Sequence, residues 1–331
     1  MNFVIIGCGN IAQRHALEAT NHGNLLAVCD INEEKAKQLA QKFNCKNYTS
    51  LDELLANEKE VDVASICTPN WLHAPQSIQC LQNGLNVLCE KPMAITATDA
   101  MAMTEAAAQS GKKLFIVKQN RYNPLARYVK QLIDNQQLGK IYSFTANCFW
   151  NRSASYYQDW RGKKDLDGGS LYTQFSHYID LIVWFWGEVK SASLLAANMN
   201  HPYIEFEDTG VVQLVMQNGV VGSINYTVNA FHKNMESSIA IFGERGTIKI
   251  GGQYLNNIEY FCVDGITAPQ IPVEQGPNEY GFYQGSLSTH DKVYKNLVEA
   301  LSLPGHEMLE GEEGVKTVKA IELIYNNKVS L

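Results

Sequence analysis

The first half of the chain alternates short apolar runs with segments of helical character. Five runs rich in β-branched residues predict strands at 2–7, 25–30, 61–68, 86–90 and 113–117. Helix-like segments separate them, at 10–22, 33–43, 71–83 and 96–110. Strands buried on both faces have near-continuous apolar runs, and intervening helices provide the crossovers between parallel strands. This half therefore predicts a parallel sheet with helices on both faces.

The second half alternates apolar and polar positions over longer runs, at 140–150, 189–199, 210–219, 219–230 and 237–252. Hairpin-type turns such as Asn218-Gly219 and Arg245-Gly246 join some of them. Helices are expected at about 168–187 and 313–327. This pattern indicates an open antiparallel sheet with one face covered by helix and the other free. We expect two domains, residues 1–121 and 122–331, the second of the α+β class.

Composition narrows the functional classes. The 331 residues are 45% hydrophobic and 18% charged, as in an ordinary globular protein, and exceed what one core usually holds. A net charge of −7 without a basic block argues against a nucleic-acid or anionic-membrane partner. The N-terminus does not resemble a signal peptide, and the most apolar stretch, 178–187, is too short to span a bilayer. We expect a cytoplasmic protein.

The eight cysteines are scattered, and no pair has C-x-x-C spacing. That spacing is typical of zinc ribbons and thioredoxin-type motifs, so we expect no metal. Cys29, Cys67 and Cys89 each close an apolar run and are best explained as small buried thiols. Scattered thiols in a chain of this size favour a reducing compartment.

A G-x-G-x-x-A motif, residues 7–12, follows the first strand and opens a helix. Asp30 ends the next strand, which completes the context of a dinucleotide-binding unit. Gly7 permits the tight turn, Gly9 permits close backbone approach to a pyrophosphate, and the helix start at Asn10 and Ile11 offers N–H groups to the phosphates. Asp30 would bind both ribose hydroxyls and repel a 2′-phosphate, which favours NAD over NADP. The alternative is a domain of this fold that binds no nucleotide.

Two further strand ends should reach the same cofactor crevice. Thr68, Pro69 and Asn70 form a turn after the third strand, and His73 follows, as a cofactor contact or a helix-surface histidine.

The neighbouring strand ends in Glu90-Lys91-Pro92. A buried charge is costly unless it is paired, so Lys91 either is solvated or has a task in the cleft. There it could bind a substrate hydroxyl and take part in acid–base chemistry. We hypothesise a cis Lys91–Pro92 bond, because such bonds favour tight functional turns.

The helical block carries a second candidate group. Asp167 is expected to cap a helix that opens through Gly168-Gly169-Ser170. Thr173 and His177 are one turn apart and share a face. Gln174 and His177 suggest a polar face in a cleft, although a histidine on an apolar helix is usually a satisfied core residue. His177 has a near-neutral intrinsic pKa, suited to accepting a hydroxyl proton.

The segments GCGNIAQRH, TPNWLHAPQSIQCLQNGLNVLCEKPMA and GGSLYTQFSHYIDL together resemble the Gfo/Idh/MocA oxidoreductase family. The resemblance covers essentially the whole chain. It implies an N-terminal Rossmann domain that binds NAD(P), followed by a domain with an open, mostly antiparallel sheet for substrate specificity and oligomer contacts. It also implies that Lys91 and His177 are the catalytic pair, and leaves open which one is the base.

A narrower resemblance, in segments 115–134, 156–181 and 205–214, is to bacterial UDP-N-acetylglucosaminuronate (UDP-GlcNAcA) 3-dehydrogenases. They oxidise the sugar 3-hydroxyl on a route to surface-polysaccharide (lipopolysaccharide) sugars. Segment 278–282 is similar to the one that precedes their last helices. Besides the residues above, the resemblance implies cofactor contacts from Glu90, Lys91, Gln119, Trp160 and Arg161. It implies a substrate site of Lys91, Lys118, Asn120, Arg121, Asn123, Arg161, Thr173, Gln174 and His177.

The chain departs from that group in three places. Thr173 stands where an Asn or Asp is usual, and segment 281–290 is altered. Phe175 stands where a Gly is usual, and one consequence would be a bulkier pocket wall. The exact sugar therefore stays open.

The pyrophosphate and carboxylate of a UDP-linked uronate require several cations in the pocket. The candidates are Lys91, Lys118, Arg121, Arg152 and Arg161. Of these, Arg152 is expected to be an ordinary surface charge. Another NAD-dependent sugar or inositol dehydrogenase of the family is the first alternative, and a non-catalytic NAD-binding regulator is the second. We expect a homodimer or homotetramer formed through the open sheet.

Overall fold

The computed structural model describes residues 1–272, 276–279, 284–303 and 310–329. The chain forms two compact units. Unit 1 comprises residues 1–118 and 290–318, and unit 2 comprises residues 119–289 and 319–331. Segment 290–318 lies far beyond the domain boundary predicted at residue 121, yet it is grouped with the N-terminal unit. Part of the predicted similarity at 278–282 and of the altered segment 281–290 falls outside the described residues.

Unit 1 contains a six-stranded parallel sheet of order β3-β2-β1-β4-β5-β6. Its strands are β1 (Asn2–Ile6), β2 (Asn24–Cys29), β3 (Lys46–Tyr48), β4 (Val63–Ile66), β5 (Asn86–Cys89) and β6 (Leu114–Ile116). The five predicted strands are confirmed, whereas the three-residue edge strand β3 was not predicted. The strand order reverses between β1 and β4, and ligands of open α/β sheets bind at the carboxyl ends of the strands beside such a reversal.

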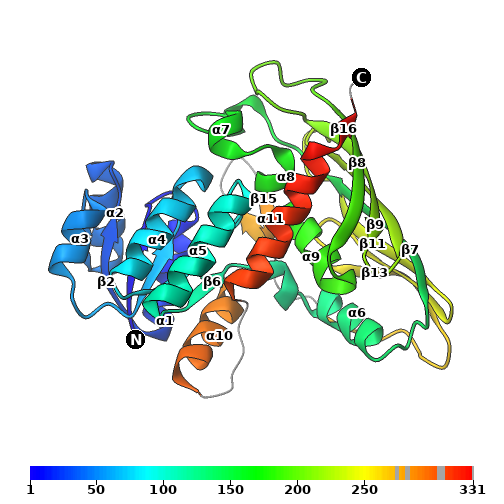
Figure 1. The fold of residues 1–331 in the computed structure, drawn as a ribbon, viewed down its shortest axis with the longest axis horizontal. Helices are drawn as coiled ribbons and strands as arrows, with labels where there is room; N and C mark the ends of the chain where they lie inside the picture. Colours follow the sequence, from blue (N-terminus) through cyan, green and yellow to red (C-terminus); the bar gives the residue numbers. More distant parts are fainter. Residues whose placement is uncertain (273–275, 280–283, 304–309, 330–331) are drawn as a thin grey trace. The chain divides into compact units, whose positions relative to one another are not determined.

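The helices of unit 1 are α1 (Ala12–His22), α2 (Glu33–Phe43), α3 (Leu51–Asn57), the 3-10 turn η1 (Asn70–Leu72), α4 (His73–Gln82), α5 (Ala97–Ser110) and α10 (His290–Ser302). Asn32 and Thr96 cap α2 and α5 as expected, by accepting hydrogen bonds from backbone N–H groups. Ser50 caps α3 in the same way, although neither this cap nor this helix was predicted. Figure 1 shows α4 and α5 packed side by side.

Unit 2 is built on an eight-stranded sheet of order β13-β12-β11-β7-β10-β9-β8-β16. Its strands are β7 (Ile141–Phe149), β8 (Val189–Ala197), β9 (Thr209–Met216), β10 (Val221–Thr227), β11 (Glu236–Gly243), β12 (Gly246–Gly251), β13 (Asn257–Val263) and β16 (Lys328–Val329). Two pairs, β7 with β10 and β8 with β16, are parallel, and the others are antiparallel. A separate two-stranded sheet pairs β14 (Pro277–Glu279) with β15 (Gln284–Leu287). The mostly antiparallel architecture is confirmed.

The helical elements of unit 2 are η2 (Gln119–Tyr122), α6 (Pro124–Asp134), η3 (Ala154–Tyr156), α7 (Lys164–Asp167), α8 (Ser170–Thr173) and α9 (Ser176–Trp186). Helix α11 (Gly311–Asn326) is grouped with unit 1 as far as Val318 and with unit 2 beyond it. The single helix predicted at 168–187 was wrong, because the chain breaks at Gln174-Phe175 between α8 and α9. Asp167 does not cap a helix start. It ends α7, and Gly168 follows in the left-handed region at φ +90°.

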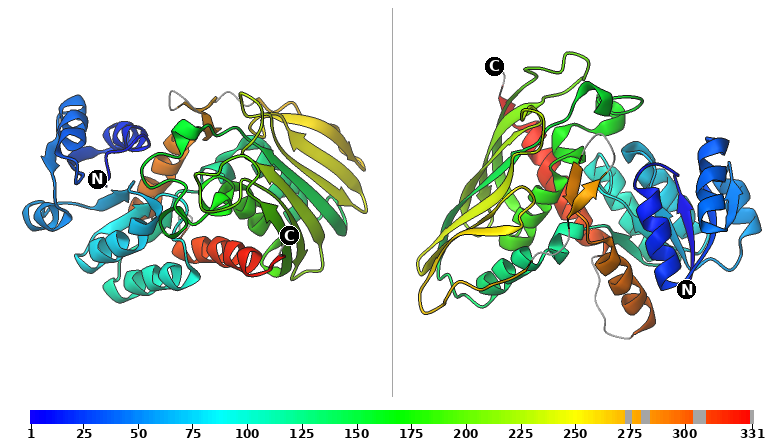
Figure 2. Two further views of the ribbon diagram at one scale, coloured as in Figure 1. Left: turned by 90° about the horizontal axis from the view of Figure 1, so that it is seen from above. Right: turned by 180° about the vertical axis from the view of Figure 1, so that it is seen from behind.

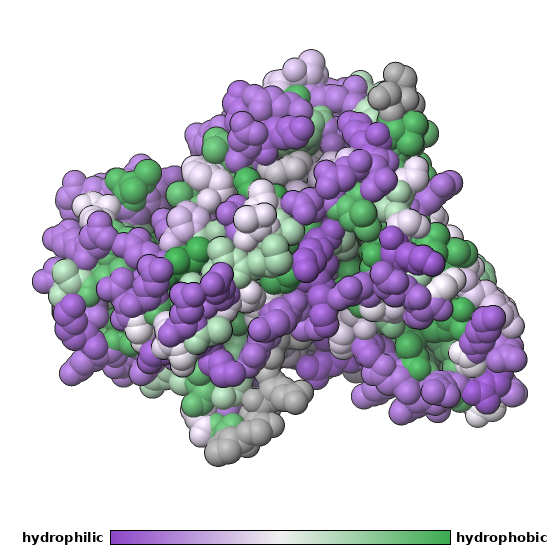
Figure 3. Space-filling view, viewed as in Figure 1, coloured by the Kyte–Doolittle hydropathy of each residue, from purple (hydrophilic) through white to green (hydrophobic). Residues whose placement is uncertain are grey.

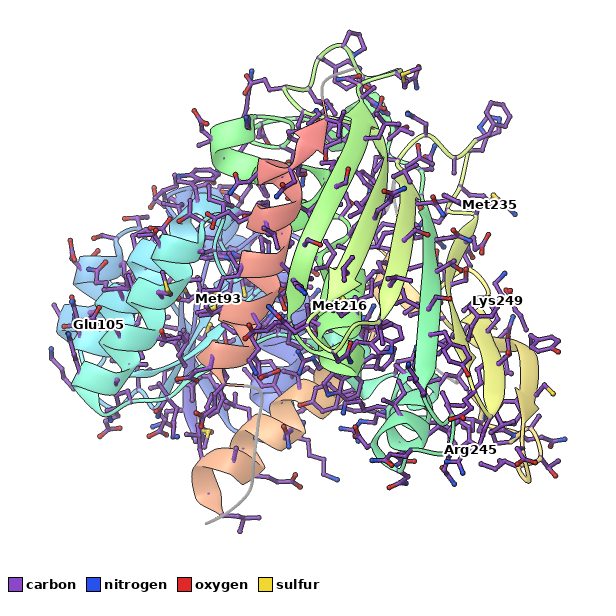
Figure 4. All side chains as sticks on the ribbon, turned by 45° about the vertical axis from the view of Figure 1, so that its right-hand side comes forward. Met93, Glu105, Met216, Met235, Arg245 and Lys249 are labelled. Carbon is purple, nitrogen blue, oxygen red and sulfur yellow. The ribbon has the colours of Figure 1, made fainter. Side chains whose placement is uncertain are left out.

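One face of the unit 2 sheet is covered and the other is open. In both views of Figure 2 the described helices of unit 2 lie on one side of the sheet. On that side Phe144 of β7 stacks on Trp186 of α9, with ring centroids 4.1 Å apart. Figure 4 looks onto the other face, where Lys249 is labelled on β12. Partly exposed apolar side chains on the strands include Tyr142, Leu195, Val211, Val221 and Phe242.

The surface of unit 1 is mainly polar on the face drawn in Figure 3, with scattered hydrophobic residues. Apolar residues that occur singly on a surface are ordinary in globular proteins. No helix in the described part of the chain combines the length and the apolar character that a bilayer span requires. All eight cysteines are free thiols.

Candidate active site

The glycine-rich turn of unit 1 lies at the strand-order reversal. Gly7 follows β1 in the left-handed region at φ +93°, and a Cβ there would lie 2.7 Å from the Thr68 nitrogen, after β4. A side chain at this position is therefore excluded on two grounds. A Cβ on Gly9, in contrast, would meet no described atom within 4 Å, so this side of the turn is open. The positive φ of Gly7 fits the predicted tight turn, and the pyrophosphate contact of Gly9 stays a prediction.

Helix α1 begins beside this open turn. Ile11 stands at its N-cap position, and none of the described side chains caps it. Ala12 is fully buried, and its small side chain suits close packing of the helix against the strand. An uncapped helix start leaves backbone N–H groups and the positive end of the helix dipole available to phosphates.

Asp30 is held in place by backbone N–H groups. Its Oδ2 accepts a hydrogen bond from the Cys8 N–H at 2.7 Å, and its Oδ1 accepts one from Asn32 at 2.8 Å. The carboxylate thus stands at the end of β2 next to the glycine-rich turn, with lone pairs left for further donors. The open turn, the uncapped helix and the oriented carboxylate together fit an adenosine diphosphate with free ribose hydroxyls.

The sequence left two alternatives for His73, a cofactor contact or a histidine on the helix surface. The second is wrong, because only 1% of His73 is exposed. Its Nδ1 lies 2.7 Å from the Pro92 carbonyl oxygen and its Nε2 lies 2.8 Å from that of Thr68. Asn70 is also buried, in the turn η1. His73 therefore connects the turn after β4 with the residue that follows Lys91.

The charged end of β5 is not simply solvated. Glu90 is buried, and its Oε1 accepts hydrogen bonds from His15 and His290, which sequence reasoning did not assign. Lys91 is partly exposed, and its backbone N–H donates to Glu90 Oε2 at 3.0 Å. The Lys91–Pro92 bond is cis, as hypothesised.

Within unit 2, a chain of polar contacts leads to His177 on α9. Gln119 Nε2 donates to Ser286 Oγ at 2.8 Å, and Ser286 Oγ lies 3.4 Å from His177 Nε2. All three side chains are buried. Ser286 lies on β15 and had no signal in the sequence. Lys91 belongs to unit 1 and His177 to unit 2, and their convergence stays a prediction.

Two neighbouring acceptors in η2 are buried without a donor among the described residues: Gln119 Oε1 and Asn120 Oδ1. An unmade hydrogen bond of this kind costs about 1–3 kcal/mol. A ligand with hydroxyl or amide donors would remove that cost. These residues were predicted to bind cofactor and substrate, respectively.

Four other predicted ligand residues already have partners within their own units. Lys118 Nζ donates to Thr317 Oγ1 at 2.8 Å in unit 1. In unit 2 the Arg121 guanidinium makes a two-point ion pair with Asp180. Asn123 caps α6 and donates to the Leu255 carbonyl, and the Thr173 hydroxyl donates to Asp167. These contacts position the surrounding elements, and the ligand roles of the four residues stay predictions.

Two arginines share the ring of Tyr156. The Arg152 guanidinium lies 5.2 Å from its centroid and that of Arg161 lies 5.0 Å away, while Arg161 also lies 4.8 Å from the Trp160 ring. The expectation that Arg152 is an ordinary surface charge was wrong, because it is 2% exposed. Its Nε donates to Gln174 Oε1 at 2.9 Å. Arg152 is buried and Arg161 is half-buried. Guanidinium groups over aromatic rings are well suited to carboxylates and phosphates.

The bulk of Phe175 is taken up by packing inside unit 2. The side chain is fully buried, with its ring 5.2 Å from that of Tyr226 and 5.6 Å from that of Trp150. This departure from the resembled group is therefore accommodated in the core of unit 2.

Comparison with known proteins gives one consistent result. Residues 1–118 match the Gfo/Idh/MocA oxidoreductase family with its NAD-binding Rossmann fold, and residues 126–249 match the family's C-terminal domain. Similar solved structures include the WlbA dehydrogenase from Bordetella pertussis with NADH and UDP-GlcNAcA, at 33% identity and a TM-score of 0.87, covering 98% of this chain and 95% of that one.

A second WlbA structure, from Chromobacterium violaceum and also with NADH and UDP-GlcNAcA, is 33% identical with a TM-score of 0.88, covering 99% of this chain and 93% of that one. Among curated relatives, glucose-6-phosphate 3-dehydrogenase from Bacillus subtilis is 28% identical over 97% of this chain and 94% of its own length. The chain therefore belongs to the Gfo/Idh/MocA family of oxidoreductases, and its N-terminal domain is an NAD-binding Rossmann fold.

Proposed function

We propose that this NAD-dependent sugar dehydrogenase oxidises the 3-hydroxyl of UDP-linked N-acetylglucosaminuronate to a 3-keto sugar. The observation that carries the proposal is the pair of WlbA structures, which match nearly the whole chain at 33% identity and hold NADH with UDP-GlcNAcA. The curated Bacillus subtilis relative supports attack at the same carbon, since its name specifies position 3 of a sugar.

The residues of unit 1 fit the cofactor. Gly7 permits the tight turn and Gly9 leaves room for the pyrophosphate. The N-terminus of α1 binds the charge of the pyrophosphate, and Asp30 binds the ribose hydroxyls. Bound NAD supplies the acceptor for the hydrogen and electron pair that leave the sugar carbon. Asp30 would repel a 2′-phosphate, which favours NAD over NADP.

The residues of this chain handle the proton and the substrate's charge. Lys91 or His177 accepts the hydroxyl proton as the carbon loses its hydrogen, and the protein holds the geometry in which this occurs. The uronate and the pyrophosphate are assigned to Arg152 and Arg161 around Tyr156, with Lys118. Gln119 and Asn120 offer acceptors to donors of the ligands.

A panel of substrates tests the proposal, with turnover followed by NADH absorbance and the product identified by NMR. UDP-GlcNAcA should give the highest kcat/KM. UDP-N-acetylglucosamine, which lacks the carboxylate, should be about 10–100-fold poorer, because one charge-assisted contact is lost. Absence of NADH formation with UDP-GlcNAcA would refute the proposal.

A hexose phosphate is the second candidate substrate, favoured by the 97% coverage of the glucose-6-phosphate 3-dehydrogenase relative. Glucose 6-phosphate and the inositols therefore belong in the panel, and faster turnover of either would assign the enzyme to that branch. With UDP-GlcNAcA as the substrate, the enzyme would act in the synthesis of a surface-polysaccharide sugar.

We also propose that the open face of the unit 2 sheet forms a homodimer or homotetramer interface.

A further inference from the structure

The carboxylate of Glu90 is fixed by contacts from three segments of unit 1. His15 Nε2, from α1, lies 2.9 Å from Glu90 Oε1, and His290 Nε2, from the first residue of α10, lies 3.2 Å from the same oxygen. The remaining oxygen, Oε2, accepts the Lys91 backbone N–H. His15 and His290 are essentially inaccessible to solvent, with 0% and 1% exposure. A residue next to Lys91 is thus anchored on both of its carboxylate oxygens.

The hydrogen-bond partners of both His15 ring nitrogens are consistent with a neutral ring. If both histidines are neutral, each donates from Nε2 to Glu90. His15 Nδ1 then accepts from the Tyr294 hydroxyl at 2.9 Å, and Ser65 donates to Tyr294 at 2.8 Å. Burial raises the pKa of Glu90, but the hydrogen bonds from His15 and His290 outweigh it and hold that pKa well below its usual range. Burial lowers the pKa of His15, consistent with the neutral ring.

A third buried histidine anchors the other side of Lys91. His73, from the start of α4, lies within hydrogen-bond distance of the carbonyl oxygens of Pro92 and Thr68. Because a neutral imidazole has one N–H, it donates to one of these carbonyls at a time. The backbone is therefore held before Lys91 through Glu90 and after it through Pro92, by helices that begin at residues 12, 73 and 290.

We propose that His15, His290 and His73 are positioning residues that fix the backbone on both sides of Lys91 and so aim its ammonium at the reacting hydroxyl. This inference rests on the proposed catalytic role of Lys91. Lysine has a flexible four-carbon stem, so its reach is set largely by where the backbone is held. Misplacement of a catalytic group by about 1 Å costs as much as about 100-fold in rate.

The same three groups also have the composition of a metal site. The ligand atoms of His15, Glu90 and His290 lie within 4.8 Å of one another, and two histidines with one carboxylate suit several divalent ions. The Nε2 atoms of His15 and His290 already bond to Glu90 Oε1, and all three side chains are buried. His290 Nδ1 has no partner among the described residues. The contacts to Glu90 Oε1 are those of a hydrogen-bonded cluster. Metal analysis of the purified protein distinguishes this cluster from a metal site.

The test compares His290→Ala with His290→Gln in the full chain. Glutamine keeps an N–H donor near the position of Nε2, whereas alanine removes it. In His290→Ala we expect kcat to fall by about 100-fold, with the KM values within about threefold. Hydrogen exchange at the Lys91 amide, followed by mass spectrometry, should become at least about tenfold faster. His290→Gln should restore most of both properties. His15→Ala and His15→Gln form a second pair if the first does not fold.

His22→Gln is the matched control, because His22 lies on the same helix as His15 and stacks on the Tyr294 ring with centroids 6.5 Å apart. It should leave kcat and Lys91 exchange unchanged. The exchange measurement needs no substrate, so it judges the inference even if UDP-GlcNAcA is not turned over. Unchanged Lys91 exchange in the alanine variants would overturn the inference. Stoichiometric divalent metal that is lost in His290→Ala would overturn it as well.

Discussion

Arg121 and Asp180 form a buried two-point ion pair between η2 and α9. Arg121 Nε and Nη2 each lie 2.8 Å from one Asp180 oxygen, and the two side chains are 4% and 3% exposed. The sequence resemblance assigned Arg121 to the substrate. In the structure the pair neutralises its charge and ties the segment that carries Gln119 and Asn120 to the helix that carries His177.

Removing one partner of this pair should be severely destabilising. Arg121→Ala leaves the Asp180 carboxylate buried without its counter-charge, which costs about 3–5 kcal/mol in unfolding free energy. Chemical denaturation measures the change. Lys113→Ala is the control, since Lys113 and Glu310 form an exposed pair, worth about 0–1 kcal/mol. Similar losses for the two variants would contradict the structural role of Arg121.

Substitution of either proposed catalytic residue should abolish turnover and spare cofactor binding. Lys91→Met and His177→Asn each remove a proton-transfer group, so kcat should fall by about 10²–10⁴-fold. The Kd for NAD, measured by fluorescence titration, should change little. The pH profile identifies the base, because its variant alone loses the acidic limb of kcat/KM. Lys113→Met, an exposed lysine, should behave as wild type, and full activity of Lys91→Met would disprove its role.

Asp30 should decide between the two dinucleotides. Its carboxylate is oriented by the N–H groups of Cys8 and Asn32. Asp30→Ala removes two charge-assisted contacts to the ribose, so kcat/KM for NAD should fall by at least about tenfold. Activity with NADP should rise, because the repulsion of a 2′-phosphate is gone. Parallel assays with both cofactors measure the ratio, and a wild-type preference for NADP would show that the assignment is wrong.

Asp208 should make stability depend on pH in the acidic range. Burial raises its pKa, but hydrogen bonds from the Met199 and Asn200 N–H groups and from His201 prevail and lower that pKa from 3.8 to about 2. Below 3.8 the unfolded chain binds a proton that the folded protein still rejects. The stabilisation is therefore complete above that pH and is lost as the pH falls towards about 2.

Melting temperatures measured across this range test the assignment. The Tm of Asp208→Asn should fall less steeply with acidification than that of the wild type. Asp165→Asn, on an exposed position of α7, should keep the wild-type slope. Identical slopes for wild type and Asp208→Asn would mean that another carboxylate controls acid stability.

The open face of the unit 2 sheet should be the oligomer interface. Leu195 and Val211 are 47% and 41% exposed on paired strands, where Leu195 lies opposite Val211. Charged residues are disfavoured at the core of an interface. The double variant Leu195→Glu/Val211→Glu should therefore dissociate the wild-type oligomer, as measured by light scattering.

Met101→Glu is the control for this experiment, because Met101 is 44% exposed on α5 of unit 1. It should leave the oligomer intact. A monomeric wild-type protein at micromolar concentration would contradict the proposed interface, as would an oligomer that survives the double substitution.

The local features of this protein were determined by its sequence. The glycine-rich turn, the strand–helix alternation and Asp30 at the end of β2 follow from hydrophobic periodicity and from backbone chemistry within a few residues. The helix caps at Asn32 and Thr96 have the same origin. Lys91 is a candidate because it is a charge at the end of a strand, and His177 because it lies on a polar helix face. The family resemblance adds that the two form the catalytic pair.

The tertiary structure decided which distant groups meet. Glu90 and His290 are 200 positions apart, and Arg121 and Asp180 are 59 apart. The burial of Arg152 likewise depends on Gln174 and Asn234, which come from other elements. Such pairings have no short-range pattern, because a charged side chain has the same local sequence signature whether it is solvated or neutralised across the fold. Only the packing of the elements determines its environment, and hence its charge state and role.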